Sequence, residues 1–127
     1  MKPIIFLLVL SITTTILAQY APTQPEYTAR VFQTEVNKYA TAGDRMGLGG
    51  MFANEFIYEA CDKSKHNYEI YTNLLIRAGG AGRVITARAD KRFVIYEVQY
   101  PGFSNEVMIR QTVFGWKFQR AQPTICL

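Results

Sequence analysis

The sequence has few of the residues on which many enzymes and metal proteins depend. Its 127 residues include one histidine, His66, and two cysteines. No cluster has the spacing of a metal site, and no glycine-rich phosphate loop is present. With one histidine and scattered acids, we also expect no Ser/His/Asp set. The sequence therefore predicts no catalytic residue, no metal and no cofactor.

Apolar runs long enough to span a bilayer are absent, since a transmembrane helix needs roughly 20 apolar residues. The run Ile4–Leu10 follows a lysine and precedes a Ser/Thr-rich stretch that leads to Ala18. This layout is typical of a signal peptide cleaved after a small residue. We expect residues 1–18 to be a signal peptide, a signal anchor being the alternative. Residues 19–127 would then be one secreted, extracellular domain with no membrane partner.

The chain carries a mild positive charge, +4 overall, without a basic arm. We therefore expect no nucleic-acid partner. Basic residues are densest in one stretch, at Arg83, Arg88, Lys91 and Arg92. A solvated strand face is the simpler interpretation, and a weak anionic partner is the alternative.

The two cysteines predict one disulfide. In an exported chain the pair Cys61 and Cys126 is expected to be oxidised. A reactive thiol is the alternative, but no local motif would lower the pKa of either thiol. His66, among lysines in a polar connection, is expected to be a solvated residue.

Helical spacing of apolar residues predicts two main helices and a short one. The first begins at a capping box over Thr23–Glu26 and ends at Gly43. Asp44 caps the short second helix, and Ser64 or Asn67 caps the third, which ends at Gly79. The expected buried faces are Val31, Phe32, Val36, Tyr39 and Ala40 in the first helix and Ile70, Leu74 and Leu75, beside Tyr71, in the third.

Period-2 alternation predicts five strands. The first, Phe56–Cys61, lies between the short helix and the third helix, and the others follow that helix. Their expected bounds are 83–89, 92–100, 105–114 and 116–121. The chain is thus predicted to be α+β.

The segment Tyr39–Cys61 resembles the nuclear transport factor 2-like superfamily. The resemblance is carried by Ala42-Gly43-Asp44, by Phe52-Ala53-Asn54-Glu55-Phe56 and by Gly115-Trp116-Lys117-Phe118. It is greatest with small secreted members found in nematodes. It implies N-terminal helices packed on a curved, mostly antiparallel sheet, in the order helix, helix, strand, helix and four strands. The first and last strands of this cone-shaped, cystatin-like architecture run parallel, so Cys61 and Cys126 would meet.

The resemblance also implies a pocket between the helices and the sheet. The candidates for its lining are Phe56, Tyr58, Tyr96 and Trp116, although core packing is the default role of aromatic residues at strand spacing. In isomerase-like members a carboxylate inside the pocket moves the proton. In this sequence the position of that carboxylate is occupied by Ala60, whose side chain has no proton to move. The nearest candidate acids are Glu59, whose simpler role is a solvent-facing strand residue, and Asp44, whose simpler role is a helix cap.

The sequence favours a non-enzymatic secreted domain that binds a small apolar ligand or a protein partner. Dimerisation through the outer sheet face belongs to the same hypothesis. One alternative is a small pocket enzyme, an isomerase or dehydratase, that uses Glu59 or Asp44. Another is a cystatin-like protease inhibitor, because Gln111-Thr112-Val113-Phe114-Gly115 has the Gln-x-Val-x-Gly spacing of an inhibitory loop. Cystatins have one main helix, so helix order separates this alternative from the others.

Overall fold

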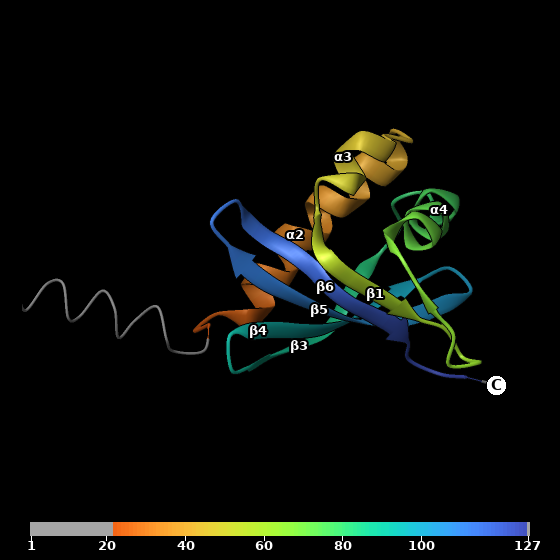
Figure 1. Ribbon diagram of the computed structural model, residues 1–127. Helices are drawn as coiled ribbons and strands as arrows, with labels where there is room; N and C mark the ends of the chain where they lie inside the picture. Colours follow the sequence, from red (N-terminus) through yellow and green to blue (C-terminus); the bar gives the residue numbers. More distant parts are fainter. Residues whose placement is uncertain (1–21, 127) are drawn as a thin grey trace, which may run out of the picture.

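The computed structural model describes residues 22–126, and the predicted signal peptide lies outside these residues. The described elements are α2 (Pro25–Thr41), α3 (Arg45–Gly49), β1 (Phe52–Glu59), β2 (Lys65–His66), α4 (Tyr68–Ala78), β3 (Arg83–Asp90), β4 (Phe93–Tyr100), β5 (Phe103–Thr112) and β6 (Gly115–Pro123). Figure 1 shows the helices on one face of a curved sheet. No described helix has the length and apolar character needed to cross a bilayer.

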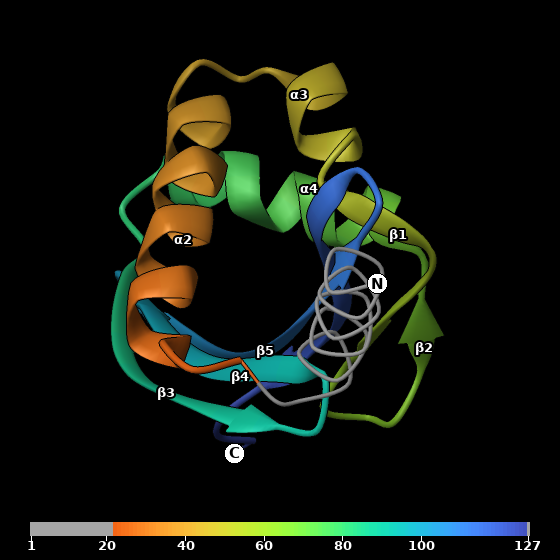
Figure 2. The same cartoon turned by 90° about the vertical axis from the view of Figure 1, so that its left-hand side faces the viewer.

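The sheet contains six strands in the order β2-β1-β6-β5-β4-β3. Within residues 22–126, β1 and β6 form the one parallel pair, and the other neighbouring strands are antiparallel. The view in Figure 2 shows β3, β4 and β5 curving beneath the helices. The predicted α+β class and curved, mostly antiparallel sheet are confirmed.

Two strand predictions were wrong in detail. β1 begins at Phe52, four residues earlier than the expected start at Phe56. Its pairing with β6 shifts register between Phe52 and Ile57. Such a shift breaks the alternation on which the prediction depended. The short strand β2 is not predicted, since Lys65–His66 lies in a stretch whose polar composition is typical of a connection.

Local signals placed most helix ends correctly. Asp44 accepts a hydrogen bond from the Gly47 amide, 2.9 Å away, and so caps α3. Asn67 caps α4, which ends at Gly79 with φ 73°. The predicted capping box at the start of α2 is not formed, because Gln24 is the N-cap and no side chain caps this end.

The buried faces of the helices are rotated relative to the prediction. Val31 is 48% exposed and Ile70 is 44% exposed. Consecutive helical residues point about 100° apart, so each lies at the margin of the stripe that packs on the sheet. The buried residues are Ala29, Phe32, Gln33, Val36 and Ala40 in α2 and Tyr71, Thr72 and Leu75 in α4.

Aromatic rings fill the space between the helices and the centre of the sheet. Phe118 of β6 is 1% exposed, and its ring centroid lies 4.8 Å from Phe32 and 4.7 Å from Phe52. Phe56 and Tyr71 complete the contacts around it, at 6.0 and 5.7 Å. Edge and offset contacts at these separations are favourable beyond simple burial.

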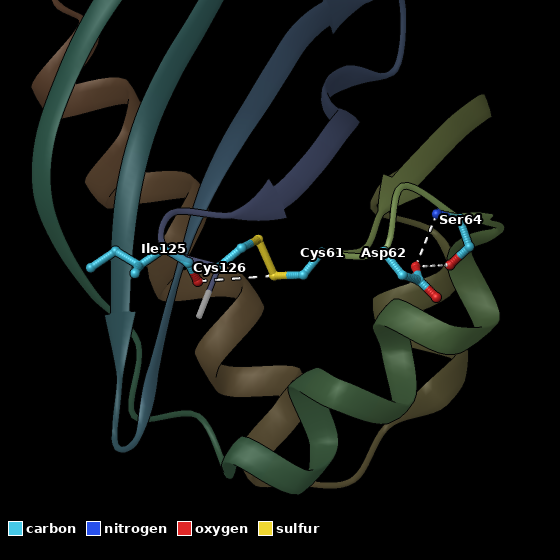
Figure 3. Close-up of a disulfide and its surroundings, with 5 residues drawn as sticks. All are labelled: Cys61, Asp62, Ser64, Ile125 and Cys126. Carbon is cyan, nitrogen blue, oxygen red and sulfur yellow. Dashed lines mark hydrogen bonds between the residues drawn. A yellow bond between two sulfur atoms is a disulfide. The ribbon is translucent and has the colours of Figure 1, made fainter.

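The predicted disulfide between Cys61 and Cys126 is present, with a Cα–Cα distance of 5.4 Å (Figure 3). Each cysteine follows one member of the parallel pair β1 and β6. Strands that run parallel end at the same edge of the sheet. The topology therefore brings together two residues that are 65 positions apart.

Candidate functional site

The residues predicted to line a pocket lie in or against the core. Phe56, Tyr58 and Tyr96 are 5%, 8% and 1% exposed, and half-buried Trp116 packs against the same cluster. Tyr58 stacks on Tyr71 with ring centroids 5.2 Å apart. These side chains therefore belong to the core or pack against it, and their role as pocket lining stays a prediction.

A polar network that the sequence did not predict lies between α2 and the sheet. Gln33, 2% exposed, accepts a hydrogen bond from the Tyr96 hydroxyl at 2.8 Å. Its amide nitrogen donates to the Tyr100 hydroxyl at 3.0 Å and to Asn37 Oδ1 at 2.9 Å. The signal that could have revealed it is a glutamine at the same helical spacing as Ala29 and Val36.

Burial keeps the tyrosines of this network neutral. It raises the pKa of Tyr100 to about 12, although the hydrogen bond from Gln33 acts in the opposite direction. Burial also raises the pKa of Tyr96 well above its ordinary value. Both hydroxyls are therefore protonated at physiological pH and serve as hydrogen-bonding groups.

The network continues to the start of β3. Asn37 Nδ2 donates to the Gly82 carbonyl at 2.8 Å, and the Gly82 amide donates to Asn37 Oδ1 at 3.3 Å. A Cβ on Gly82 would lie 2.5 Å from Gln33 Nε2 and 2.7 Å from Tyr100 Cε1. Glycine therefore allows this close approach of α2 and the β3 backbone. A depression of about 280 Å³ lies here, lined by Arg30, Gln33, Thr34, Asn37, Gly82, Arg83 and Val84.

The two candidate acids lie apart and form other interactions. Glu59 forms an ion pair with Arg120, 3.4 Å away, on the sheet face opposite Tyr58. Asp44 is exposed and caps α3. Neither Glu59 nor Asp44 supplies the carboxylate that is missing at Ala60, so the prediction made from Ala60 stands as a prediction.

The structure brings together Asp62, Ser64 and His66, although no such set was expected. Ser64 Oγ lies 2.5 Å from Asp62 Oδ1 and 2.8 Å from His66 Nε2 (Figure 3 shows the first pair). Hydrogen bonds from the Ser64 hydroxyl and amide lower the pKa of the exposed Asp62 carboxyl, with a further contribution from His66. In a nucleophilic triad the histidine lies between serine and acid. Here serine is in the middle and donates its proton to the carboxylate, so His66 does not activate it.

The outer face of the sheet carries half-buried apolar side chains between charged ones, and Ile95 on this face is only 5% exposed. Pairing places Ile95 beside Met108, Met108 beside Arg120, and Arg120 beside Ile57. A depression of about 280 Å³ lies on this face, lined by Arg88, Ile95, Glu106, Met108, Arg120 and Gln122. Glu97 and Glu106 are direct cross-strand neighbours beside it.

The tip of the β5–β6 hairpin exposes two large apolar side chains. Val113 is 92% exposed and Phe114 is 85% exposed. Thr112 Oγ1 accepts a hydrogen bond from the Phe114 amide at 3.1 Å and donates to the Gly115 carbonyl at 2.8 Å, which holds the turn. The predicted inhibitor-like segment therefore lies at a projecting turn.

The arrangement defines a cone-shaped α+β domain in which helices close the concave face of a curved sheet. The sequence matches no profile of a known protein family, and no curated protein matches it. Solved structures share the fold. One is a nuclear transport factor 2-like protein of unknown function from Silicibacter pomeroyi, with TM-score 0.62, 11% identity and coverage of 79% of this chain and 94% of that one.

Two further structures show the same likeness. A nuclear transport factor 2-like protein from Cytophaga hutchinsonii has TM-score 0.55, 10% identity and coverage of 77% and 95%. A putative Ca/calmodulin-dependent kinase II association domain from Exiguobacterium sibiricum has TM-score 0.54, 13% identity and coverage of 81% and 94%. The chain therefore has the nuclear transport factor 2-like fold, and at these identities the likeness concerns the fold alone.

Proposed function

We propose that this protein is a secreted, non-enzymatic binding domain, of the kind that small exported nematode members of the fold represent. Its partner is a protein, bound through the outer sheet face. The observation that carries the proposal is two half-buried apolar side chains on that face, Ile57 and Met108, which lie on either side of Arg120 among charged side chains of both signs. Apolar surface ringed by charge is typical of protein interfaces.

A second copy of the chain fits this face. Glu97 and Glu106 lie side by side, and neither belongs to an ion pair within residues 22–126. Like charges directly opposite on neighbouring strands destabilise a sheet. In a two-fold dimer the same patch meets itself, so Arg88 and Arg120 of one copy can approach these glutamates in the other.

Replacing Met108 by glutamate is expected to dissociate the dimer. The change puts a third carboxylate near Glu97 and Glu106 and removes one of the two half-buried apolar side chains of the face. We expect the dimer dissociation constant, measured by native mass spectrometry and sedimentation on the unreduced secreted protein, to rise about 100-fold or more. The matched control is Met46→Glu, because Met46 is 89% exposed on α3.

Two results would count against the sheet-face proposal. One is a wild-type protein that stays monomeric at high concentration, and the other is equal dimerisation of M108E and the wild type. A co-purified small molecule in the same spectra would instead favour an apolar ligand held between helices and sheet. The isomerase-type alternative is less favoured, because Glu59 and Asp44 are engaged with Arg120 and α3.

The exposed hairpin tip favours a second candidate, inhibition of a papain-like cysteine protease. Val113 and Phe114 project where an inhibitory loop would enter a cleft. The helix order argues against it, since two main helices, α2 and α4, and short α3 replace the single main helix of a cystatin. If the candidate is right, the protein inhibits papain, and Phe114→Ser weakens inhibition about tenfold or more. Absence of inhibition at micromolar protein would exclude it.

A further inference from the structure

Helix α2 lies beside the edge strand β3 (Figure 2), and two neighbouring depressions lie where they meet. Its first part is the depression of about 280 Å³ that includes Arg30, Asn37 and Arg83. Its second part, of about 470 Å³, is lined by Gln24, Pro25, Glu26, Tyr27, Arg30 and Ala87. Arg30 borders both parts, so we call them together the α2–β3 groove.

Two arginines of this groove have no acidic partner in the described chain. The ion pairs within residues 22–126 are Glu55–Arg110 and Glu59–Arg120. Glu26 precedes Arg30 by one helical turn, yet the two side chains form no ion pair. Arg30 and Arg83 are exposed at the groove, and within residues 22–126 neither guanidinium group forms an ion pair, so their donors can serve another group.

The floor adds a donor and offers few acceptors. Gln33 uses its amide hydrogens on Asn37 and Tyr100 and receives the Tyr96 hydroxyl. Within residues 22–126, Asn37 Nδ2 donates to the Gly82 carbonyl alone, which leaves its second N–H for a ligand. A site that presents guanidinium and amide N–H groups suits an oxyanion, since hydrogen bonds to a charged acceptor are the strong ones.

We propose that the α2–β3 groove binds a small organic anion. A carboxylate, sulfate or phosphate group lies between Arg30 and Arg83, and the apolar body of the ligand lies on Val84 or extends past Arg30 toward Tyr27 and Ala87. The volume of the first part is at the lower limit of ligand pockets, which fits a small acidic group. The site is separate from the outer sheet face and does not depend on dimerisation.

The test is a titration of the ¹⁵N-labelled full secreted protein with phenyl phosphate, benzoate and inorganic phosphate, followed by amide shifts. We expect saturable shifts at Arg30, Asn37, Gly82 and Arg83 with an aromatic probe. Arg30→Gln and Arg83→Gln should each raise the dissociation constant about tenfold, the effect of losing one charge-assisted contact. An aromatic probe should bind more tightly than inorganic phosphate, because its apolar body adds contacts; equal binding of the two would overturn the assignment of an organic ligand to the groove.

The matched control is Arg92→Gln, which removes the same charge from the exposed β3–β4 turn. It should leave the dissociation constant within about twofold, below the loss of one charge-assisted hydrogen bond. Equal weakening by R92Q and R30Q would overturn the proposal, because it would show attraction to net charge alone. Absence of saturable shifts with every probe would also overturn it. The dispersion of the variant spectra separates loss of binding from loss of folding.

Discussion

Replacing both Cys61 and Cys126 by serine is expected to lower the free energy of unfolding by about 4 kcal/mol. The bridge joins residues 65 positions apart, so its removal releases a long loop in the unfolded chain. For a domain of this size the loss corresponds to a fall in Tm of about 15 °C or more. Chemical denaturation gives the free energy, and thermal unfolding gives Tm.

Reduction supplies the internal control for the disulfide. A reductant should lower the Tm of the wild type toward that of the double-serine protein and leave the serine protein unchanged. The mass of the unreduced wild type should be two hydrogens below that of the dithiol. A double variant as stable as the wild type would contradict the prediction, because residual structure in the unfolded chain or strain in the native bridge would then offset the loop entropy.

Truncating Phe118 to alanine is expected to cost about 3–5 kcal/mol. Phe118 is 1% exposed and contacts rings from α2, β1 and α4, so no single element can move to fill the space that it leaves. Urea or guanidinium unfolding, followed by far-UV circular dichroism, measures the loss. The variant should unfold at a lower denaturant concentration with a similar slope.

Phe114→Ala provides the matched control for Phe118→Ala. It removes the same atoms from a side chain that is 85% exposed, so we expect a change of about 0.5 kcal/mol or less. Equal effects of the two changes would contradict the assignment of Phe118 to the core. A small effect of Phe118→Ala alone would mean that the surrounding rings collapse into the space.

Local sequence signals predicted part of the fold because they act within a few residues. Asp44 and Asn67 cap helices wherever a helix follows, since their side chains reach amides two or three positions ahead. Gly79 ends α4 because it adopts positive φ without a steric penalty. The capping box predicted at Thr23 does not form. A capping box needs Ser or Thr at the N-cap, and the N-cap of α2 is Gln24.

Other features depended on contacts between distant residues. In the sequence, Gln33 has the pattern of an ordinary polar helical residue. It becomes buried and hydrogen-bonded because β4 places Tyr96 and Tyr100 beside it. The α2–β3 groove likewise joins residues of α2 to Gly82 and Arg83, which follow α4. Periodicity identifies the buried stripe of a helix only to within one position. It therefore predicts that Val31 is buried, whereas Val31 is 48% exposed.

By itself the sequence determined the α+β class, most helix ends and the pairing of its two cysteines. Each of these follows from short-range periodicity, from a capping interaction or from the count of cysteines. Tertiary structure alone decided the Gln33 network, the Asp62–Ser64–His66 contact and the aromatic contacts around Phe118. It also decided that Arg30 and Arg83 line the same depression. The physical reason is that burial and long-range hydrogen bonds depend on how separate elements pack, and no local pattern encodes that packing.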